Sequence, residues 1–233
     1  MRGGRSAVAL GRGGALLLVV AVWSGCGSAT EPSVPVVLEA ATPTILAGTV
    51  GTAVTPAPSV RVTDGAGTPV AGVMVNFDVS GMSGSIATPS GLSDANGLAS
   101  VGSWTLPTRA GSASLTARVG ETRVFFVAEA EAGPVTHIWL VGGNGQIGTA
   151  GDPLPDRLQV RVTDAAPAYN SIVGVAVTFT VISGGGSVDG ASTVTDADGH
   201  AESGAWTLGP LVGTQEVKVE AGSVQVNFTA TAN

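Results

Sequence analysis

Five residues, VRVTD, occur twice in this chain, at 60–64 and again at 160–164. Further matched pieces follow in the same order: VMVNFDV with VAVTFTV, SDANG with TDADG, WTL with WTL, and FVAEA with FTATA. The partners are 100 positions apart at VRVTD and 102 positions apart from VMVNFDV onward. Repeats of this length are large enough to fold alone. The 233-residue chain is therefore expected to contain two tandem domains.

The matched pieces alternate apolar and polar residues with the period of a β-strand. In the second copy of one piece the residues of one parity are Val175, Val177, Phe179 and Val181. The first copy alternates in the same way over 73–79, and so do 217–220 and 224–228 near the end of the second repeat. Alternation of this kind predicts strands with one buried and one solvated face, as in an antiparallel sandwich.

The turns and glycines agree with an all-β fold. DANG and DADG place Asn or Asp before Gly, which favours a positive φ in a hairpin connection. Gly102 and Gly204 lie where the strand parity changes, which indicates a bulge that turns the following tryptophan inward. Trp104 and Trp206 are therefore expected in the core rather than on a ligand surface.

The N-terminus has the order of a secretory signal. Arg2, Arg5 and Arg12 precede the apolar run GGALLLVVAVW, and the small residues SGCGS follow it. This run is too short to span a bilayer comfortably. We expect a signal peptide at 1–25 and an exported protein.

Cys26 is the only cysteine, so no internal disulfide can form. Its place after Ser24 and Gly25 resembles the lipobox of bacterial lipoproteins, in which the cysteine is acylated and becomes the mature N-terminus, although Trp23 stands where that pattern usually has Leu. The resemblance implies lipidation at Cys26 and, because Gly27 is not the Asp that retains such proteins at the inner membrane, an outer-membrane or cell-surface location. Residues 26–34 would form a flexible tether. An ordinary cleaved signal and secretion are the alternative.

Without its first 25 residues the chain has seven basic and 17 acidic residues, a net charge of −10. A surface of this kind disfavours nucleic acid as a partner, because phosphate binding needs many Lys and Arg side chains. Anionic membrane surfaces are disfavoured for the same reason.

The ordered pieces VRVTD, V.V.F.V, TDADG, WTL and V.F.ATA resemble the bacterial Ig-like group 1 (Big-1) domain, the repeat of invasin and intimin adhesins. The resemblance implies two tandem immunoglobulin-like β-sandwich domains without an inter-sheet disulfide, at 35–132 and 133–233. It does not extend to the outer-membrane β-barrel or the lectin-like tip of those adhesins. Binding is therefore expected through sheet faces or loops.

Motifs that could carry chemistry have simpler structural interpretations. GNGQIG at 143–148 has the spacing of a dinucleotide loop, but the two prolines of the following TAGDPLPD forbid the helix that such a loop needs. Asp196, Asp198 and Gly199 resemble the start of an EF-hand but lack its further ligands. Glu129 and Glu131 could hold calcium between the domains, although solvated carboxylates are the commoner case.

The two histidines, His137 and His200, lie in different repeats, no cysteine nucleophile accompanies them, and no G-x-S-x-G motif occurs. We expect both at the surface or at strand edges, with no catalytic residues, metal or cofactor. The protein is therefore expected not to be an enzyme.

One asymmetry between the repeats predicts an interaction surface. The outward positions of the last strand are Gln225, Asn227 and Thr229 in repeat two, but Arg123, Phe125 and Val127 in repeat one. An apolar pair on a face that its sibling keeps polar indicates a contact. The contact is either with an external partner or with the tether or repeat two, near Trp139.

Three functions remain open from the sequence. The first is a non-enzymatic envelope protein that acts as a spacer or adhesion module with an unknown surface protein or glycan as partner. The second is a carbohydrate- or polymer-binding module, for which Tyr169 is the one plausible exposed ring. The third is a secreted accessory or inhibitor protein.

Overall fold

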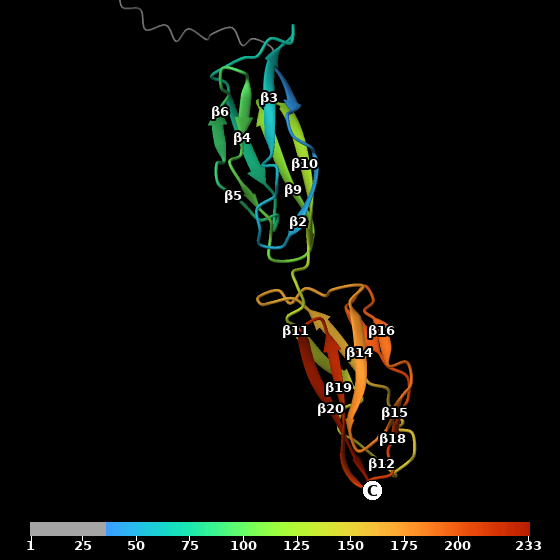
Figure 1. The fold of residues 1–233 in the computed structure, drawn as a ribbon. Coiled ribbons are helices and arrows are strands. Elements are labelled where there is room, and N and C mark those ends of the chain that lie inside the picture. Colours follow the sequence, from blue (N-terminus) through green and yellow to red (C-terminus); the bar gives the residue numbers. More distant parts are fainter. Residues whose placement is uncertain (1–35) are drawn as a thin grey trace, which may run out of the picture. The chain divides into compact units, whose positions relative to one another are not determined.

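The computed structural model describes residues 36–233, and every regular element within them is a β-strand (Figure 1). Repeat one contains β1 (Val36–Ala40), β2 (Ile45–Thr49), β3 (Ser59–Asp64), β4 (Met74–Val79), β5 (Ser85–Ile86), β6 (Ser90–Leu92), β7 (Leu98–Ser100), β8 (Trp104–Thr105), β9 (Gly111–Val119) and β10 (Thr122–Glu131). Repeat two contains β11 (His137–Gly142), β12 (Gln146–Gly148), β13 (Gln159–Thr163), β14 (Ala176–Ser183), β15 (Gly186–Val188), β16 (Ser192–Val194), β17 (His200–Glu202), β18 (Trp206–Leu208), β19 (Gly213–Ala221) and β20 (Val224–Ala232). No helix in the described residues has the length and apolarity needed to span a membrane.

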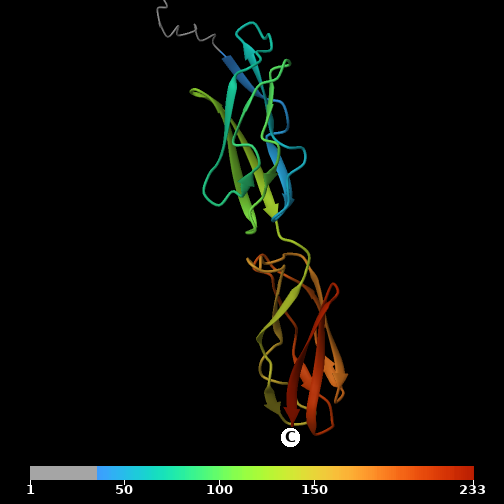
Figure 2. The same ribbon diagram turned by 90° about the vertical axis from the view of Figure 1, so that its left-hand side faces the viewer.

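Both repeats have the same topology, so that adding ten to a strand label of repeat one gives its counterpart in repeat two. One layer of repeat one has the order β1-β3-β7 and the other has the order β2-β10-β9-β4-β6, while β5 and β8 form a separate pair. In each repeat the strands lie in two layers (Figures 1 and 2). The predicted class, two tandem immunoglobulin-like β-sandwich domains, is confirmed.

The pairing is antiparallel with one exception in each repeat. The second strand, β2 or β12, runs parallel to the last strand, β10 or β20. This occurs because the chain leaves the first sheet after β1 or β11 and joins the opposite sheet as β2 or β12. In repeat two the crossing is made by Gly143 and Gly145 at φ of 81° and 73°. The GNG of GNGQIG is therefore the loop between β11 and β12, QIG forms β12 itself, and no helix follows.

The apolar residues of one parity fill two cores. By their contacts, residues 36–233 form one compact unit that contains both repeats. Within it, the buried apolar side chains form two separate clusters, one between Leu38 and Ala130 and the other between Leu154 and Ala232. Trp104 and Trp206 are fully buried, as predicted. The two clusters are consistent with domains at 35–132 and 133–233, although the exact boundary stays a prediction.

The repeated VRVTD forms the middle strand of each three-stranded sheet. Val60 and Val62 of β3, like Val160 and Val162 of β13, are fully buried. Burial of each valine contributes about 1.5–3 kcal/mol relative to an exposed one. The motif therefore recurs because each domain needs the same central strand.

The hairpin prediction for DANG and DADG was wrong in one respect. Gly97 and Gly199 have the expected positive φ, 71° and 76°. However, β6 pairs with β4 and β7 pairs with β3, so the turn joins two different sheets rather than two paired strands. Alternation within a strand does not reveal which strand is its neighbour, and the sequence pattern therefore could not show this crossing.

The predicted bulges at Gly102 and Gly204 were also wrong. The chain ends one strand, β7 or β17, before the glycine and begins another, β8 or β18, after it, with a different partner. The parity change is real, because Ala99 and Trp104 are both buried despite their opposite parity. Gly102 has a φ of 76°, which favours glycine at this break.

Candidate interaction surfaces

Phe125 and Val127 lie on the outer face of β10, where the alternation of the strand points them away from the core. Their exposed fractions are 62% and 44%. Ile45 of β2 pairs with Val127 and is 83% exposed. These three side chains form an apolar surface, here called the β10 patch.

The same position of repeat two is polar. Thr229 and Asn227 replace Val127 and Phe125, and Gly145 replaces Ile45. The Asn144 side chain accepts a hydrogen bond from the Thr229 amide at 2.9 Å, so this edge is occupied by a polar contact. The exposure of the β10 patch favours an open surface over burial against repeat two, and its role as an interaction surface stays a prediction.

Trp139 lies on the outer face of β11 and belongs to an aromatic cluster of repeat two. Its ring stacks on His137, with centroids 5.6 Å apart and planes 13° apart. Tyr169 meets both rings edge-on, at 5.1 Å from His137 and 5.5 Å from Trp139. Trp139 is 44% exposed, so this cluster presents an aromatic surface to solvent.

The aromatic cluster is held in place by hydrogen bonds. The Trp139 indole N–H donates to Thr163 Oγ1 at 3.0 Å, and Thr136 Oγ1 lies 2.9 Å from His137 Nδ1. Tyr169 is the one residue other than glycine with a positive φ, 49°, in residues 36–233. Backbone strain of this kind is typical of positions that the surrounding structure fixes.

A shallow hollow of about 280 Å³ lies on the same sheet as Trp139. It is lined by Val141, Gln159, Asp196, His200, Ala201 and Glu202. Trp139 pairs with Arg161 on the neighbouring strand, and Arg161 pairs in turn with His200, which lines the hollow. The aromatic cluster and the hollow are therefore adjacent on this sheet. His200 is exposed, and His137 is partly exposed, as predicted for surface residues.

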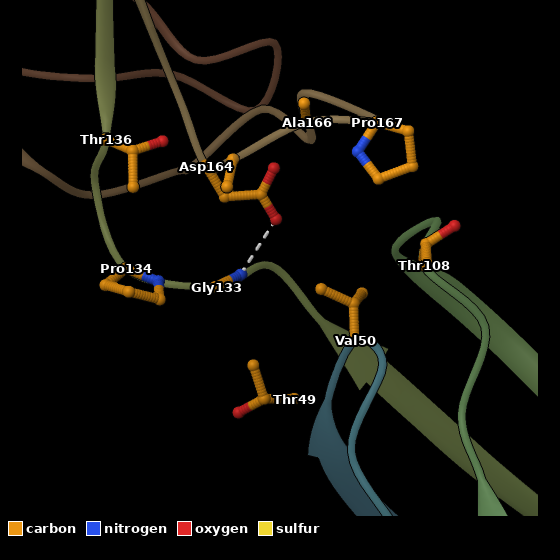
Figure 3. Close-up of a pocket in the computed structure, with 10 residues that line it drawn as sticks. Thr49, Val50, Thr108, Gly133, Pro134, Thr136, Asp164, Ala166 and Pro167 are labelled. Atoms are coloured by element: carbon orange, nitrogen blue, oxygen red, sulfur yellow. Dashed lines mark hydrogen bonds between the residues drawn. The ribbon is translucent and has the colours of Figure 1, made fainter.

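The linker between the repeats is fastened to repeat two by the last residue of the second VRVTD. The Gly133 amide donates to Asp164 Oδ2 at 3.0 Å (Figure 3). The Asn170 amide and its Nδ2 also donate to the Asp164 carboxylate, and Asp164 is only 3% exposed. Three donors therefore satisfy this buried carboxylate.

Asn170 connects this carboxylate to repeat one. Its Nδ2 donates to the Thr108 carbonyl and its Oδ1 accepts from the Ala110 amide, both at 2.8 Å. Asn170 is 8% exposed, so each of these bonds is largely shielded from water. No pattern in the sequence predicts this contact, although the change of repeat spacing from 100 to 102 marks the longer loop that carries Asn170.

A pocket of about 220 Å³ lies beside Asp164 and is lined in part by the linker (Figure 3). Its lining residues are Thr49, Val50, Thr108, Gly133, Pro134, Thr136, Asp164, Ala165, Ala166 and Pro167. The Asp164 carboxylate, its one charged group, is already engaged by Gly133 and Asn170. We therefore assign this pocket no ligand.

Asp64, at the same motif position in repeat one, holds only its own loop. Its Oδ1 accepts from the amides of Ala66 and Thr68, both at 2.9 Å. The hydrogen bonds from Thr68 and Ala66 lower the pKa of the Asp64 carboxyl from its ordinary 3.8. Because the pKa of Asp64 is lower in the folded state, the ionised carboxylate stabilises the loop at neutral pH. This stabilisation is lost as the pH falls below 3.8 and through the lower pKa of the folded state.

The acidic motifs considered above as possible calcium sites form a turn and part of a strand. Asp196 Oδ1 accepts from the amides of Asp198 and His200, which makes this segment a turn. Glu129 and Glu131 are exposed positions of β10. No group of three or more His, Cys, Asp or Glu side chains suited to a metal ion occurs within residues 36–233.

Cys26, the predicted lipidation site, lies outside the described residues, as do the predicted signal peptide at 1–25 and the tether at 26–34. These assignments stay predictions.

No protein-family model matches the chain, and no curated protein matches it. Among solved structures, the chain is similar to InvD of Yersinia pseudotuberculosis at 21% identity and a TM-score of 0.51, covering 85% of this chain and 57% of that one. It is also similar to the Escherichia coli adhesin FdeC (14% identity, TM-score 0.47, covering 84% and 64%) and to the D0-D1 domain of intimin (19%, TM-score 0.31, covering 83% and 94%). The chain thus spans less than two thirds of the InvD and FdeC structures. The likeness to InvD supports the Big-1 kind of fold.

Proposed function

We propose that this protein is a non-enzymatic Ig-like protein of the cell envelope that acts as a spacer and interaction module. The observation that carries the proposal is the Asp164–Asn170 network, which ties the linker and repeat one to repeat two. A spacer must hold its domains in a fixed relation, and buried hydrogen bonds between domains do this better than a flexible chain of similar length. Exposed surfaces on the two repeats, the β10 patch and the aromatic cluster, would make the contacts.

Anchoring through Cys26 is the part of the proposal that decides location. A lipid chain alone binds a membrane weakly, so stable attachment of a bacterial lipoprotein requires more than one acyl chain. We expect the wild-type protein in the membrane fraction of expressing cells and the Cys26→Ala variant in the soluble or secreted fraction. Cys26→Ser serves as a second variant of similar size. Wild-type protein found free in the medium would instead favour the secreted accessory or inhibitor role.

The β10 patch supplies a second test. Replacing Phe125 by Ser together with Val127 by Thr gives repeat one the polar character of repeat two. Because both side chains are exposed, we expect thermal unfolding to change little, by less than about 0.5 kcal/mol in free energy. Cross-linking capture from intact cells should lose those partners that the patch binds. A matched control is Asn227→Ala with Thr229→Ala in repeat two, at the positions of Phe125 and Val127, which should leave capture unchanged.

If the double variant captures the same partners as the wild type and gives the same scattering profile, the β10 patch has no role in binding. The envelope assignment would survive that result, because it is tested separately through Cys26.

A further inference from the structure

We propose that the outer face of the β11-β13-β17 sheet binds a neutral saccharide, with Trp139 as the surface on which a sugar ring stacks. This inference rests on the proposed role as an interaction module and names the chemical class of one partner. Trp139 is 44% exposed, whereas Trp104 and Trp206 are fully buried. An exposed indole offers a large, flat apolar area at small entropic cost.

The stacking surface is fixed before any ligand arrives. Thr163 Oγ1 accepts the indole N–H at 3.0 Å, which sets the orientation of the ring. Tyr169 meets the rings of Trp139 and His137 edge-on, and Arg161 Nη2 donates to its carbonyl oxygen at 3.4 Å. A site built from held side chains loses less entropy on binding than a mobile one.

Polar groups suited to sugar hydroxyls lie in the adjoining hollow. Glu202 Oε2 accepts from Gln159 Nε2 at 2.7 Å, and Glu202 Oε1 accepts from Arg157 at 2.9 Å. Each carboxylate oxygen has a further lone pair, so Glu202 can still accept hydrogen bonds from hydroxyls. Asp196 and His200 also line the hollow and add further polar groups. An apolar wall with a few fixed polar groups is typical of small-ligand sites.

Size and charge decide the class of ligand. The hollow, about 280 Å³, is near the lower limit of small-molecule sites, whereas a protein partner needs about 800 Å² of contact on each side. The residues that line the hollow include Asp196 and Glu202 but no Lys or Arg, and the neighbouring Arg157 is already paired with Glu202. This arrangement disfavours an anionic sugar, as does the net charge of −10 over residues 26–233. A neutral sugar ring therefore fits the hollow better than a sialylated or sulfated glycan or a protein surface.

Repeat one provides an internal comparison, because its equivalent face keeps Asp94 at the position of Asp196 but lacks the other groups. Glu39 stands at the position of Trp139 and Val37 at that of His137, while Ser59, Leu98 and Ser100 replace Gln159, His200 and Glu202. Tyr169 lies in the longer loop of repeat two. The aromatic and hydroxyl-binding groups thus occur together on this face of repeat two and not in repeat one, although the two repeats have similar buried residues beneath it.

The test measures saccharide binding by the full-length chain, purified in a polyoxyethylene detergent because glucoside and maltoside detergents would compete. An array of neutral gluco-, galacto-, manno- and N-acetylhexosamine oligosaccharides is probed together with sialylated and sulfated glycans and a proline-rich peptide. We expect neutral saccharides to bind, and Trp139→Ala to weaken the strongest of them about tenfold or more. Trp139→Tyr should retain most of the affinity, and Glu202→Gln should reduce it. Glu39→Ala, the matched control in repeat one, should leave it unchanged.

Fluorescence gives a readout that a purely structural role would not move. Saccharide should shift the emission of wild-type protein, and this shift should disappear in Trp139→Tyr while the thermal unfolding of that variant stays close to that of the wild type. Absence of neutral saccharide binding at millimolar concentration would overturn the inference, as would equal binding by Trp139→Ala or a preference for acidic glycans or the peptide. None of these failures would move the protein from the membrane fraction, so the envelope proposal is tested independently.

Discussion

Replacing Trp104 by Ala should destabilise repeat one by about 3–5 kcal/mol, because it removes the largest side chain of a closely packed core. Trp104 is fully buried, and its indole N–H donates to the Ser83 carbonyl at 2.8 Å. Urea unfolding followed by circular dichroism measures this loss, because Trp104→Ala removes the only tryptophan of repeat one. Trp206 remains as a buried reporter of repeat two, whose transition should stay where it is in the wild type. Equal loss of stability in both repeats would show that the two cores unfold as one unit.

The two tryptophans differ in a way that a milder substitution reveals. Trp206 is equally buried, but its indole N–H has no hydrogen-bond partner in the described residues. Trp206→Phe removes an unpaired donor, whereas Trp104→Phe leaves the Ser83 carbonyl without its donor. We therefore expect Trp104→Phe to cost about 1 kcal/mol more than Trp206→Phe. The same unfolding measurement compares them, and an equal cost would mean that the Trp104 bond contributes nothing net.

Asp164→Ala should be the next most damaging change, at about 2–4 kcal/mol, because it leaves three shielded donors without an acceptor. These donors are the Gly133 amide, the Asn170 backbone amide and one N–H of the Asn170 side chain. The loss should appear in the unfolding of repeat two and as faster hydrogen exchange of the Gly133 amide. The linker would then be released, and contact through Asn170 with repeat one would weaken.

Asp64→Ala is the matched control, because the residue occupies the same place in VRVTD. Its carboxylate accepts from Ala66 and Thr68 in a partly exposed loop, where water can replace the lost acceptor. We expect a clearly smaller loss of stability than for Asp164→Ala and no change in exchange at Gly133. An equal or larger loss at Asp64 would contradict the structural role assigned to the Asp164–Asn170 network.

Much of the fold could be predicted because each strand carries its own alternation. Phe77 and Phe179 occupy the apolar parity of their strands, and both are buried. Strand pairing was harder to predict from the sequence, since it depends on residues that are distant along the chain. The turns after β6 and β16 were expected to join paired strands, but they cross between the sheets. Local pattern determines which face is buried, and long-range contacts determine the neighbour.

The candidate surfaces were only partly predictable. Phe125 and Val127 were found because two repeats of one chain could be compared position by position. Trp139 and Tyr169 were each predicted as candidate surface residues, but their contact was missed, because one comes from a strand and the other from a separate loop. Asn170 was missed for a related reason: an asparagine in a loop gives no sign that both ends of its amide are engaged by distant backbone groups.

The parallel pairing of β2 with β10 has a mechanical consequence. Five residue pairs, from Ile45 with Val127 to Thr49 with Glu131, join the second strand of repeat one to its last. Tension applied at the two ends of the repeat would draw these strands in opposite directions along their axes. The bonds between them would then be sheared together rather than unzipped one after another. The domain would therefore resist stretching at the pairing of its second strand with the strand through which the load leaves it.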